Sequence, residues 1–124
     1  MDTQHTAFIK RSYDEPDERR TPPHAVVDVV RLGSHSSARL TLQPGWRWSE
    51  SVKPIVGTEH CQVLHVGVVH EGRLGVSHGT DTFELAKGDV YVIEPGHDAW
   101  VIGDEAFVGF EFESNAAEHY ATVS

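Results

Sequence analysis

Apolar and polar residues alternate over short segments of this chain, and glycine-rich turns separate the segments. Ser36–Leu42 places Ala38, Leu40 and Leu42 on one face, and Ala106–Glu113 alternates in the same way. A period of two residues is that of a half-buried β-strand. No long segment has the 3.6-residue period of an amphipathic helix, so the pattern predicts an all-β protein.

Further strands are predicted where β-branched or alternating residues lie between turns. In chain order they cover Ala25–Leu32, Cys61–His70, Arg73–Ser77, Thr82–Leu85, Asp89–Ile93 and Asp98–Ile102. Short strands at close intervals are typical of a sandwich or barrel. We therefore expect a β-barrel over residues 25–114, an N-terminal arm over residues 1–24 and a C-terminal tail over residues 115–124. Asp14–Arg20 is expected to form a turn or one helical turn, and Asn115–Tyr120 one short helix.

Two tryptophans lie where the strand pattern is interrupted. Trp46 and Trp48 belong to Trp46–Gly57, a connection without clear alternation. Aromatic side chains of this size are rarely left in water. They either pack under the connection as core residues, or line the mouth of a pocket and contact a ligand.

Composition limits the possible functions. The 124 residues suit one domain, and a hydrophobic fraction of 39% is enough for one core. The net charge of -9 argues against nucleic acids and anionic membranes, which attract clustered lysine and arginine. The single cysteine cannot form an internal disulfide, the N-terminus has no signal-peptide pattern, and no apolar run approaches about 20 residues. We therefore expect a cytoplasmic protein.

Two segments resemble the paired motifs of the cupin superfamily. His65–Gly72 reads as a strand ending at a glycine turn, and Gly88–Trp100 reads as turn, strand, a Pro95-Gly96 turn and strand. Pro44–Glu50 and Val52-Lys53-Pro54 also resemble segments of small single-domain bacterial cupins. The resemblance covers most of residues 40–113. It implies an antiparallel double-stranded β-helix (the jelly-roll or cupin barrel), a metal or small-molecule ligand inside it, and commonly a homodimer.

The resemblance weakens at the metal ligands. Cupins usually place a pair of histidines, a glutamate and a final histidine around the ion. In this chain His65 takes the position of the glutamate, and the position of the final histidine falls on Ala99. His97 lies two residues earlier, so on a regular strand it points to the same face as Ala99.

The usual histidine pair falls on one of two pairs of residues upstream, Thr58 with His60 or Glu59 with Cys61. Cys61 and His65 share one strand face. On a regular strand, four residues at about 3.3 Å each would hold them about 13 Å apart. A bend or bulge near Cys61 is therefore needed before both side chains can reach one ion.

The predicted site follows from these positions. The candidate metal ligands are His65, His97 and Cys61, and the candidate ligand-binding residues are Trp46, Trp48, His60 and Glu59. Imidazole and thiolate groups suit a divalent transition metal such as zinc, iron or nickel. Structural roles stay open, because a buried histidine can be a hydrogen-bonded core residue and a buried cysteine a small hydrophobe.

Three functions are compatible with this site. The first is a metal-dependent enzyme acting on a small organic molecule, as an isomerase, cyclase, lyase or dioxygenase. The second is a non-catalytic module that binds a small ligand without a metal. The third is a metal-free barrel whose pocket residues are structural. The departures from the usual ligand set weaken the first function and favour the other two.

Overall fold

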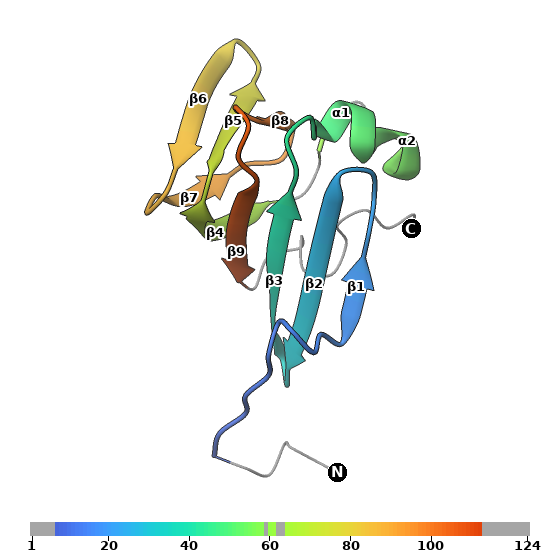
Figure 1. Ribbon diagram of the computed structural model, residues 1–124, viewed down its shortest axis with the longest axis vertical. Coiled ribbons are helices and arrows are strands. Elements are labelled where there is room, and N and C mark those ends of the chain that lie inside the picture. The colour runs from blue at the N-terminus through green and yellow to red at the C-terminus, as the bar shows by residue number, and fades with distance from the viewer. Residues whose placement is uncertain (1–6, 59, 62–63, 113–124) are drawn as a thin grey trace.

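The computed structural model describes residues 7–58, 60–61 and 64–112, and within them nine strands form two antiparallel sheets (Figure 1). The larger sheet has the order β1-β2-β3-β9-β4-β7 and the smaller the order β6-β5-β8. The strands are β1 (Glu18–Arg20), β2 (Ala25–Leu32), β3 (His35–Leu42), β4 (His65–Glu71), β5 (Arg73–His78), β6 (Asp81–Ala86), β7 (Val90–Ile93), β8 (His97–Val101) and β9 (Phe107–Phe112). The prediction of an antiparallel all-β fold is confirmed.

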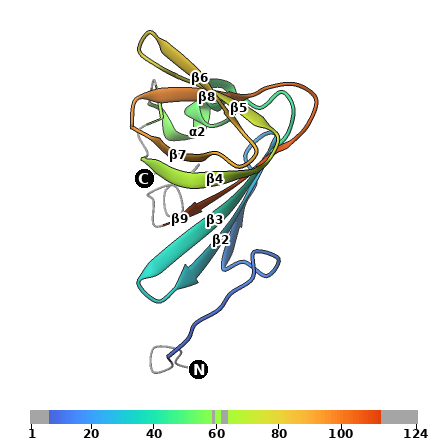
Figure 2. The ribbon, with the colours of Figure 1, turned by 90° about the vertical axis from the view of Figure 1, so that its left-hand side faces the viewer.

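The two sheets lie as layers over a shared core (Figure 2). Alternating residues of β3 and β9 point into it, and Leu42 and Phe107 are almost fully buried there. Val27 of β2 and Val76 of β5 are fully buried as well. Burying an apolar side chain of this size contributes about 1.5–3 kcal/mol. The alternation seen in the sequence therefore defines the inner face of the barrel.

Trp46–Gly57 contains two short helices, α1 (Trp48–Ser51) and α2 (Lys53–Val56), where the sequence indicated only a connection. The Asp98 carboxylate accepts a hydrogen bond from the backbone N–H of Ser49 at 3.1 Å, which ties α1 to β8. Gly57 ends α2 with a φ of 81°, a conformation that favours glycine. Four-residue helices are too short for a hydrophobic period to be visible in the sequence.

The N-terminal arm agrees with its prediction in part. Asp14–Arg20 was expected to form a turn or a helical turn, and a turn does form at its start, where the N–H of Glu15 donates to the carbonyl of Ser12 at 3.1 Å. Its last three residues instead form β1 and pair with β2. An ion pair of 2.6 Å between Arg19 and Asp28 joins the two strands. Further upstream, Tyr13 stacks on Phe110 of β9, with ring centroids 5.2 Å apart. The arm thus lies against the outer face of the larger sheet.

Two remaining expectations concern other parts of the chain. The helix expected over Asn115–Tyr120 lies outside the described residues. Among the residues that are described, no helix has the length and apolar character needed to cross a membrane.

Candidate metal centre

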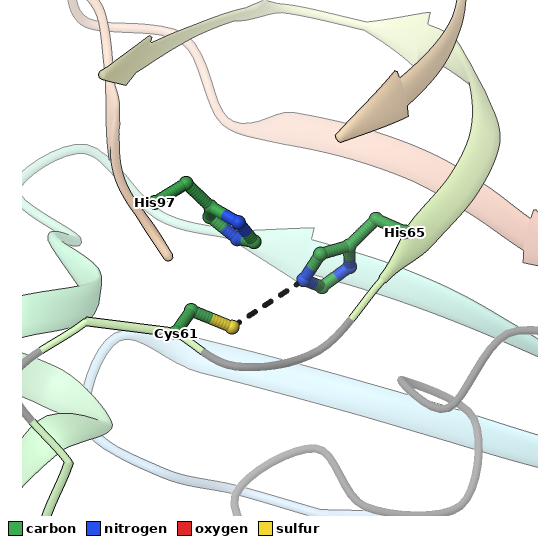
Figure 3. Close-up of side chains that lie close together, drawn as sticks. All are labelled: Cys61, His65 and His97. Atoms are coloured by element: carbon green, nitrogen blue, oxygen red, sulfur yellow. Dashed lines mark hydrogen bonds between the residues drawn. The ribbon is translucent and has the colours of Figure 1, made fainter. Parts of the chain in front are cut away.

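Three side chains of types that can bind a metal converge inside the barrel. One ligand atom each from Cys61, His65 and His97 lies within 4.8 Å of the other two, and all three residues are buried (Figure 3). A tetrahedral ion with bonds of about 2.0–2.3 Å needs ligand atoms roughly 3.5 Å apart. Small side-chain rotations would therefore bring these three atoms to the separations that one ion requires.

Cys61 reaches this cluster by pairing with the chain around His97. The strand predicted over Cys61–His70 begins only at His65, and Cys61 instead forms an isolated bridge with His97. Its backbone N–H donates to the carbonyl oxygen of His97 at 2.8 Å, and its own carbonyl accepts from Gly96 at 2.6 Å. The Sγ atom consequently lies 3.5 Å from Nε2 of His65. On a regular strand, the Cα atoms of the two residues would be about 13 Å apart.

A buried carboxylate orients His65. Oε1 of Glu111, on β9, lies 2.8 Å from Nδ1 of His65, and Oε2 accepts a hydrogen bond of 2.8 Å from the Tyr91 hydroxyl. An ionised carboxylate accepts hydrogen bonds through both oxygens. With Glu111 in this form, the hydrogen bond from His65 uses a proton on Nδ1. This leaves Nε2 of the ring facing Cys61.

His97 is oriented in the same way by backbone. Its Nδ1 lies 2.7 Å from the carbonyl oxygen of Glu94, which can only accept a hydrogen bond. The His65 and His97 rings meet edge to face, with centroids 4.9 Å apart. Both Nδ1 atoms are thus engaged as donors, so in the neutral imidazoles both Nε2 lone pairs are available. Metal-binding histidines are commonly fixed by such a hydrogen bond from the second ring nitrogen.

Gly67 makes room for the buried carboxylate. It lies on β4 between Tyr91 of β7 and Glu111 of β9 in the strand register. A Cβ atom at this position would come within 2.9 Å of both the Tyr91 hydroxyl and Cγ of Glu111. Because Gly67 has no side chain on the inward face of β4, the His65 imidazole, the Glu111 carboxylate and the Tyr91 phenol can pack together.

The surroundings favour the charged forms of the thiol and the imidazole. Burial raises the pKa of Cys61, but hydrogen bonds and charges from His65 and His97 outweigh it and hold this pKa at about 6. Burial lowers the pKa of His65, but the Glu111 charge and hydrogen bonds to Cys61 and Glu111 raise it to about 10. Burial and Glu111 also raise the pKa of Tyr91 far above its usual value. When no metal is bound, both shifts favour a buried thiolate–imidazolium pair of Cys61 and His65.

A small cavity of about 30 Å³ adjoins the two histidines. It is lined by Leu40, Leu42, Trp46, Trp48, His65, Leu74, Tyr91, Ile93, His97, Ala99, Phe107 and Glu111. Most of these side chains are apolar. The indole N–H of Trp46 is buried and has no hydrogen-bond partner among the described residues. This cavity is the space in which a ligand could approach the cluster.

The structure assigns different surroundings to the other residues singled out in the sequence. Trp46 and Trp48 are both buried and line the cavity, which is compatible with either of their two predicted roles. His60 is exposed and is not among the lining residues. Glu59 lies outside the described residues. Ala99, at the position of the final cupin histidine, lines the cavity without offering a ligand atom.

Sequence reasoning missed Glu111 and Tyr91. Both carried a usable signal, because each lies on an alternating strand at a position that shares a face with buried apolar residues. In β9 that face also contains Phe107 and Gly109, and in β7 it contains Ile93. A carboxylate on an inward face needs a buried partner, and a histidine on the inward face of another strand can supply one.

Several solved structures with a similar fold are cupin or double-stranded β-helix proteins. A protein of unknown function from Rhizobium leguminosarum bv. viciae is 21% identical, with a TM-score of 0.62 over 86% of this chain and 97% of that one. A sugar phosphate isomerase of the cupin superfamily from Silicibacter pomeroyi is 15% identical, with a TM-score of 0.60 over 84% of this chain and 74% of that one.

The chain also matches part of a larger enzyme. The oxalate decarboxylase of Lactobacillus farciminis, solved as a formate complex, is 21% identical with a TM-score of 0.56. The match covers 77% of this chain but only 30% of the decarboxylase. No protein-family model and no curated protein matches the sequence. The chain therefore has the double-stranded β-helix fold of cupins, as its two motifs predicted, and these likenesses establish the fold alone.

Proposed function

We propose that Cys61, His65 and His97 bind one divalent transition metal inside the barrel, and that the protein is a metal-dependent enzyme acting on a small organic molecule. The observation that carries this proposal is the orientation of the two imidazoles. Each Nδ1 donates to an acceptor, Glu111 or the carbonyl of Glu94, so that each Nε2 is left for the ion.

The donor set fits such an ion. A thiolate with two imidazoles suits zinc, iron or nickel, and three protein ligands leave at least one coordination position for water or substrate. When bound, the metal would supply Lewis-acid polarisation of a substrate oxygen or activation of a bound water. The chain's own residues would bind and orient: Glu111 fixes the His65 ring, and the apolar lining limits access of water.

We propose the reaction class only as broadly as the solved structures of similar fold suggest. They include an isomerase and decarboxylases, and this chain shares their fold. Isomerase, cyclase, lyase and dioxygenase chemistry are all compatible with one ion beside a small apolar cavity. If the purified protein contains no metal, the favoured alternative is a non-catalytic module that binds a small ligand.

The experiment is elemental analysis of the purified protein and two histidine variants grown under identical metal supply. His65→Ala removes a buried candidate ligand, and His70→Ala is the matched control on the same strand, because His70 is exposed and contacts Phe110 on the outer face. We expect about one metal ion per chain in the wild type and in His70→Ala, and loss of metal in His65→Ala. Equal metal in all three proteins, or none in any, would reject the proposal.

A further inference from the structure

The outer face of the larger sheet carries an apolar patch where β9, β4 and β7 lie next to one another. Outward residues of β4 pair with outward residues of β7 and β9 in the strand register. Phe112 lies on the same face as Phe110, because successive side chains of a strand alternate between the two faces. The outer apolar patch is defined by two neighbouring rows of residues across β7, β4 and β9: Val90, Val68 and Phe110 in one, and Val92, Val66 and Phe112 in the other.

Much of the outer apolar patch is open to solvent. The exposed fraction is 79% for Val90, 58% for Val92, 48% for Phe112 and 36% for Val66. An antiparallel sheet with one face in water usually carries polar residues on that face, and strands that are hydrophobic on both faces are typical of sheets covered on both sides. Contiguous exposed apolar surface of this kind marks an interaction site. We therefore expect the patch to be covered by a partner.

The N-terminal arm covers one corner of the patch. Tyr13 stacks on Phe110 with ring centroids 5.2 Å apart, and the guanidinium of Arg39 lies 5.6 Å from the centroid of the Tyr13 ring. Val90 and Val92 lie at the opposite side of the patch, on β7, and are its two most exposed residues. The described part of the arm therefore leaves the β7 side of the patch uncovered.

Charge favours a second copy of this chain as the partner. The six residues of the patch are uncharged, whereas the whole chain has a net charge of -9. Beyond one end of the patch, Glu71 and Lys87 form an ion pair of 3.3 Å. A basic partner would find no acidic side chain in the patch to pair with, and an acidic partner would be repelled by the rest of the surface. Two copies of an acidic chain approach one another at the lowest electrostatic cost where both surfaces are uncharged.

We propose that two copies of this chain associate by packing their outer apolar patches against each other about a twofold axis. Such an interface is isologous, so the same side chains meet from both copies. Sheets packed face to face lie about 10 Å apart, with interdigitating side chains. This inference goes beyond the proposed function, because it concerns the outer face of the barrel and does not depend on a metal.

The size of the patch indicates a dimer of moderate affinity. Six partly exposed side chains cover on the order of a few hundred Å². A standard interface buries about 800 Å² on each partner, so the patch would form its apolar centre and polar residues would complete its rim. We therefore expect a dissociation constant in the micromolar range.

Sedimentation equilibrium of the full chain measures this constant, over protein concentrations from about 1 to 200 μM that bracket a micromolar value. Val92→Glu and Val92→Lys each place like charges face to face across the twofold axis and should weaken the dimer at least about tenfold. Val92 is 58% exposed in the single chain, so both variants should fold. Thr82→Glu is the matched control, because Thr82 is an exposed β-branched residue on β6 of the smaller sheet. This control should keep the wild-type affinity within about twofold.

Mixing the two charged variants identifies the partner as a second copy. In a mixed dimer of Val92→Glu and Val92→Lys the introduced charges have opposite signs, so they attract where the like charges of each variant alone repel. We expect the mixture to associate at least about threefold more tightly than either variant by itself. Loss of association through unfolding would not be restored by mixing.

Three results would overturn the inference. The first is wild-type protein that stays monomeric over the whole concentration range, in which case the patch is covered by something other than a second copy. The second is a dimer whose affinity is unchanged in Val92→Glu, because association would then use another surface. The third is a mixture that associates no more tightly than its components. Each of these results leaves the proposed metal centre untested, and the metal content of the protein decides that centre separately.

Discussion

Two carboxylates are buried to the same degree in this barrel, and they have opposite kinds of partner. Asp28 and Glu111 are each only 2% exposed. Asp28 lies between two guanidinium groups, with Arg19 at 2.6 Å and Arg39 at 3.0 Å. Glu111 contacts none of the arginines described. Its partners are an imidazole and a phenol, each at 2.8 Å.

The difference separates a structural cluster from a candidate site. The two arginines around Asp28 stay protonated and offer no lone pair, so they cannot bind a metal. Around Glu111 the hydrogen bonds lead on to His65 and then to Cys61, which keep atoms able to bind a metal. Burial of a charge alone therefore does not mark a functional site. The marker is a buried charge whose partners retain unused coordinating atoms.

The largest expected effect is a loss of protein stability when the pairing of Asp28 with its two arginines is disrupted. Asp28→Asn removes the charge shared by two guanidinium groups, which remain partly exposed and so keep some hydration. We expect the free energy of unfolding to fall by about 2–3 kcal/mol, with metal content unchanged. Chemical denaturation and elemental analysis measure the two quantities. A variant of normal stability that had lost its metal would reverse the roles of the clusters.

The same chemical change at the other carboxylate should act on metal affinity. Glu111→Gln keeps the shape of the side chain but weakens the acceptor that fixes His65. Loss of such a partner typically costs tenfold to a hundredfold in metal affinity, about 1.4–2.7 kcal/mol. Competition with a chelator provides the measurement. If Glu111→Gln and Asp28→Asn gave equal metal affinities, the distinction between the clusters would fail.

Protonation of the thiolate should give the next largest effect. In metal-stripped protein the pKa of Cys61 is about 6, against an ordinary value of 9.0. Because the folded pKa is the lower one, the thiolate's contribution to stability is present above pH 9.0 and is lost as pH falls through about 6. The opposite sign holds for His65, whose contribution is present below pH 6.5 and is lost as pH rises through about 10.

Thiolate absorbance in the ultraviolet should therefore disappear on acidification with a midpoint near pH 6. Metal affinity should fall over the same range, since thiols and protonated imidazoles do not bind the ion. Cys61→Ser should lack the absorbance change and serves as its control. A midpoint near the ordinary thiol value would show that the thiolate–imidazolium pair does not form.

The smallest expected effect is at the phenol. Tyr91→Phe removes one hydrogen bond to Glu111 and leaves the bond to His65 in place. We expect metal affinity to fall about threefold, the effect of one neutral-donor hydrogen bond. Chelator competition on this variant and on Glu111→Gln, run side by side, ranks the two. A larger loss in Tyr91→Phe than in Glu111→Gln would contradict the proposed role of the carboxylate.

Much of the fold could be predicted because it depends on local patterns. The strand Ala25–Leu32 has the bounds that its β-branched residues indicated, and the turns at Gly72, Gly88 and Gly96 all have positive φ. The inward directions of His65 and His97 follow from alternation and from the Pro95-Gly96 turn. These features are determined within a few residues, so one sequence suffices to find them.

The rest depends on contacts between distant parts of the chain. The position of Cys61 depends on its pairing with His97, 36 positions away in the sequence, and no local pattern marks this pairing. Glu111 reaches His65 across the β4–β9 pair, which requires the sheet order to be known. The candidate ligands could therefore be named from the sequence, whereas their shared geometry and the carboxylate behind them could not.

The most direct test of the metal centre is titration of metal-stripped protein with Co²⁺, followed by its absorption spectrum. A thiolate ligand gives cobalt a charge-transfer band in the near ultraviolet, which imidazole and carboxylate ligands do not produce. We predict a band that saturates at one equivalent of Co²⁺ in the wild type and is absent in Cys61→Ser. No such band in the wild type, or the same spectrum in Cys61→Ser, would contradict the proposal that Cys61, His65 and His97 bind one ion.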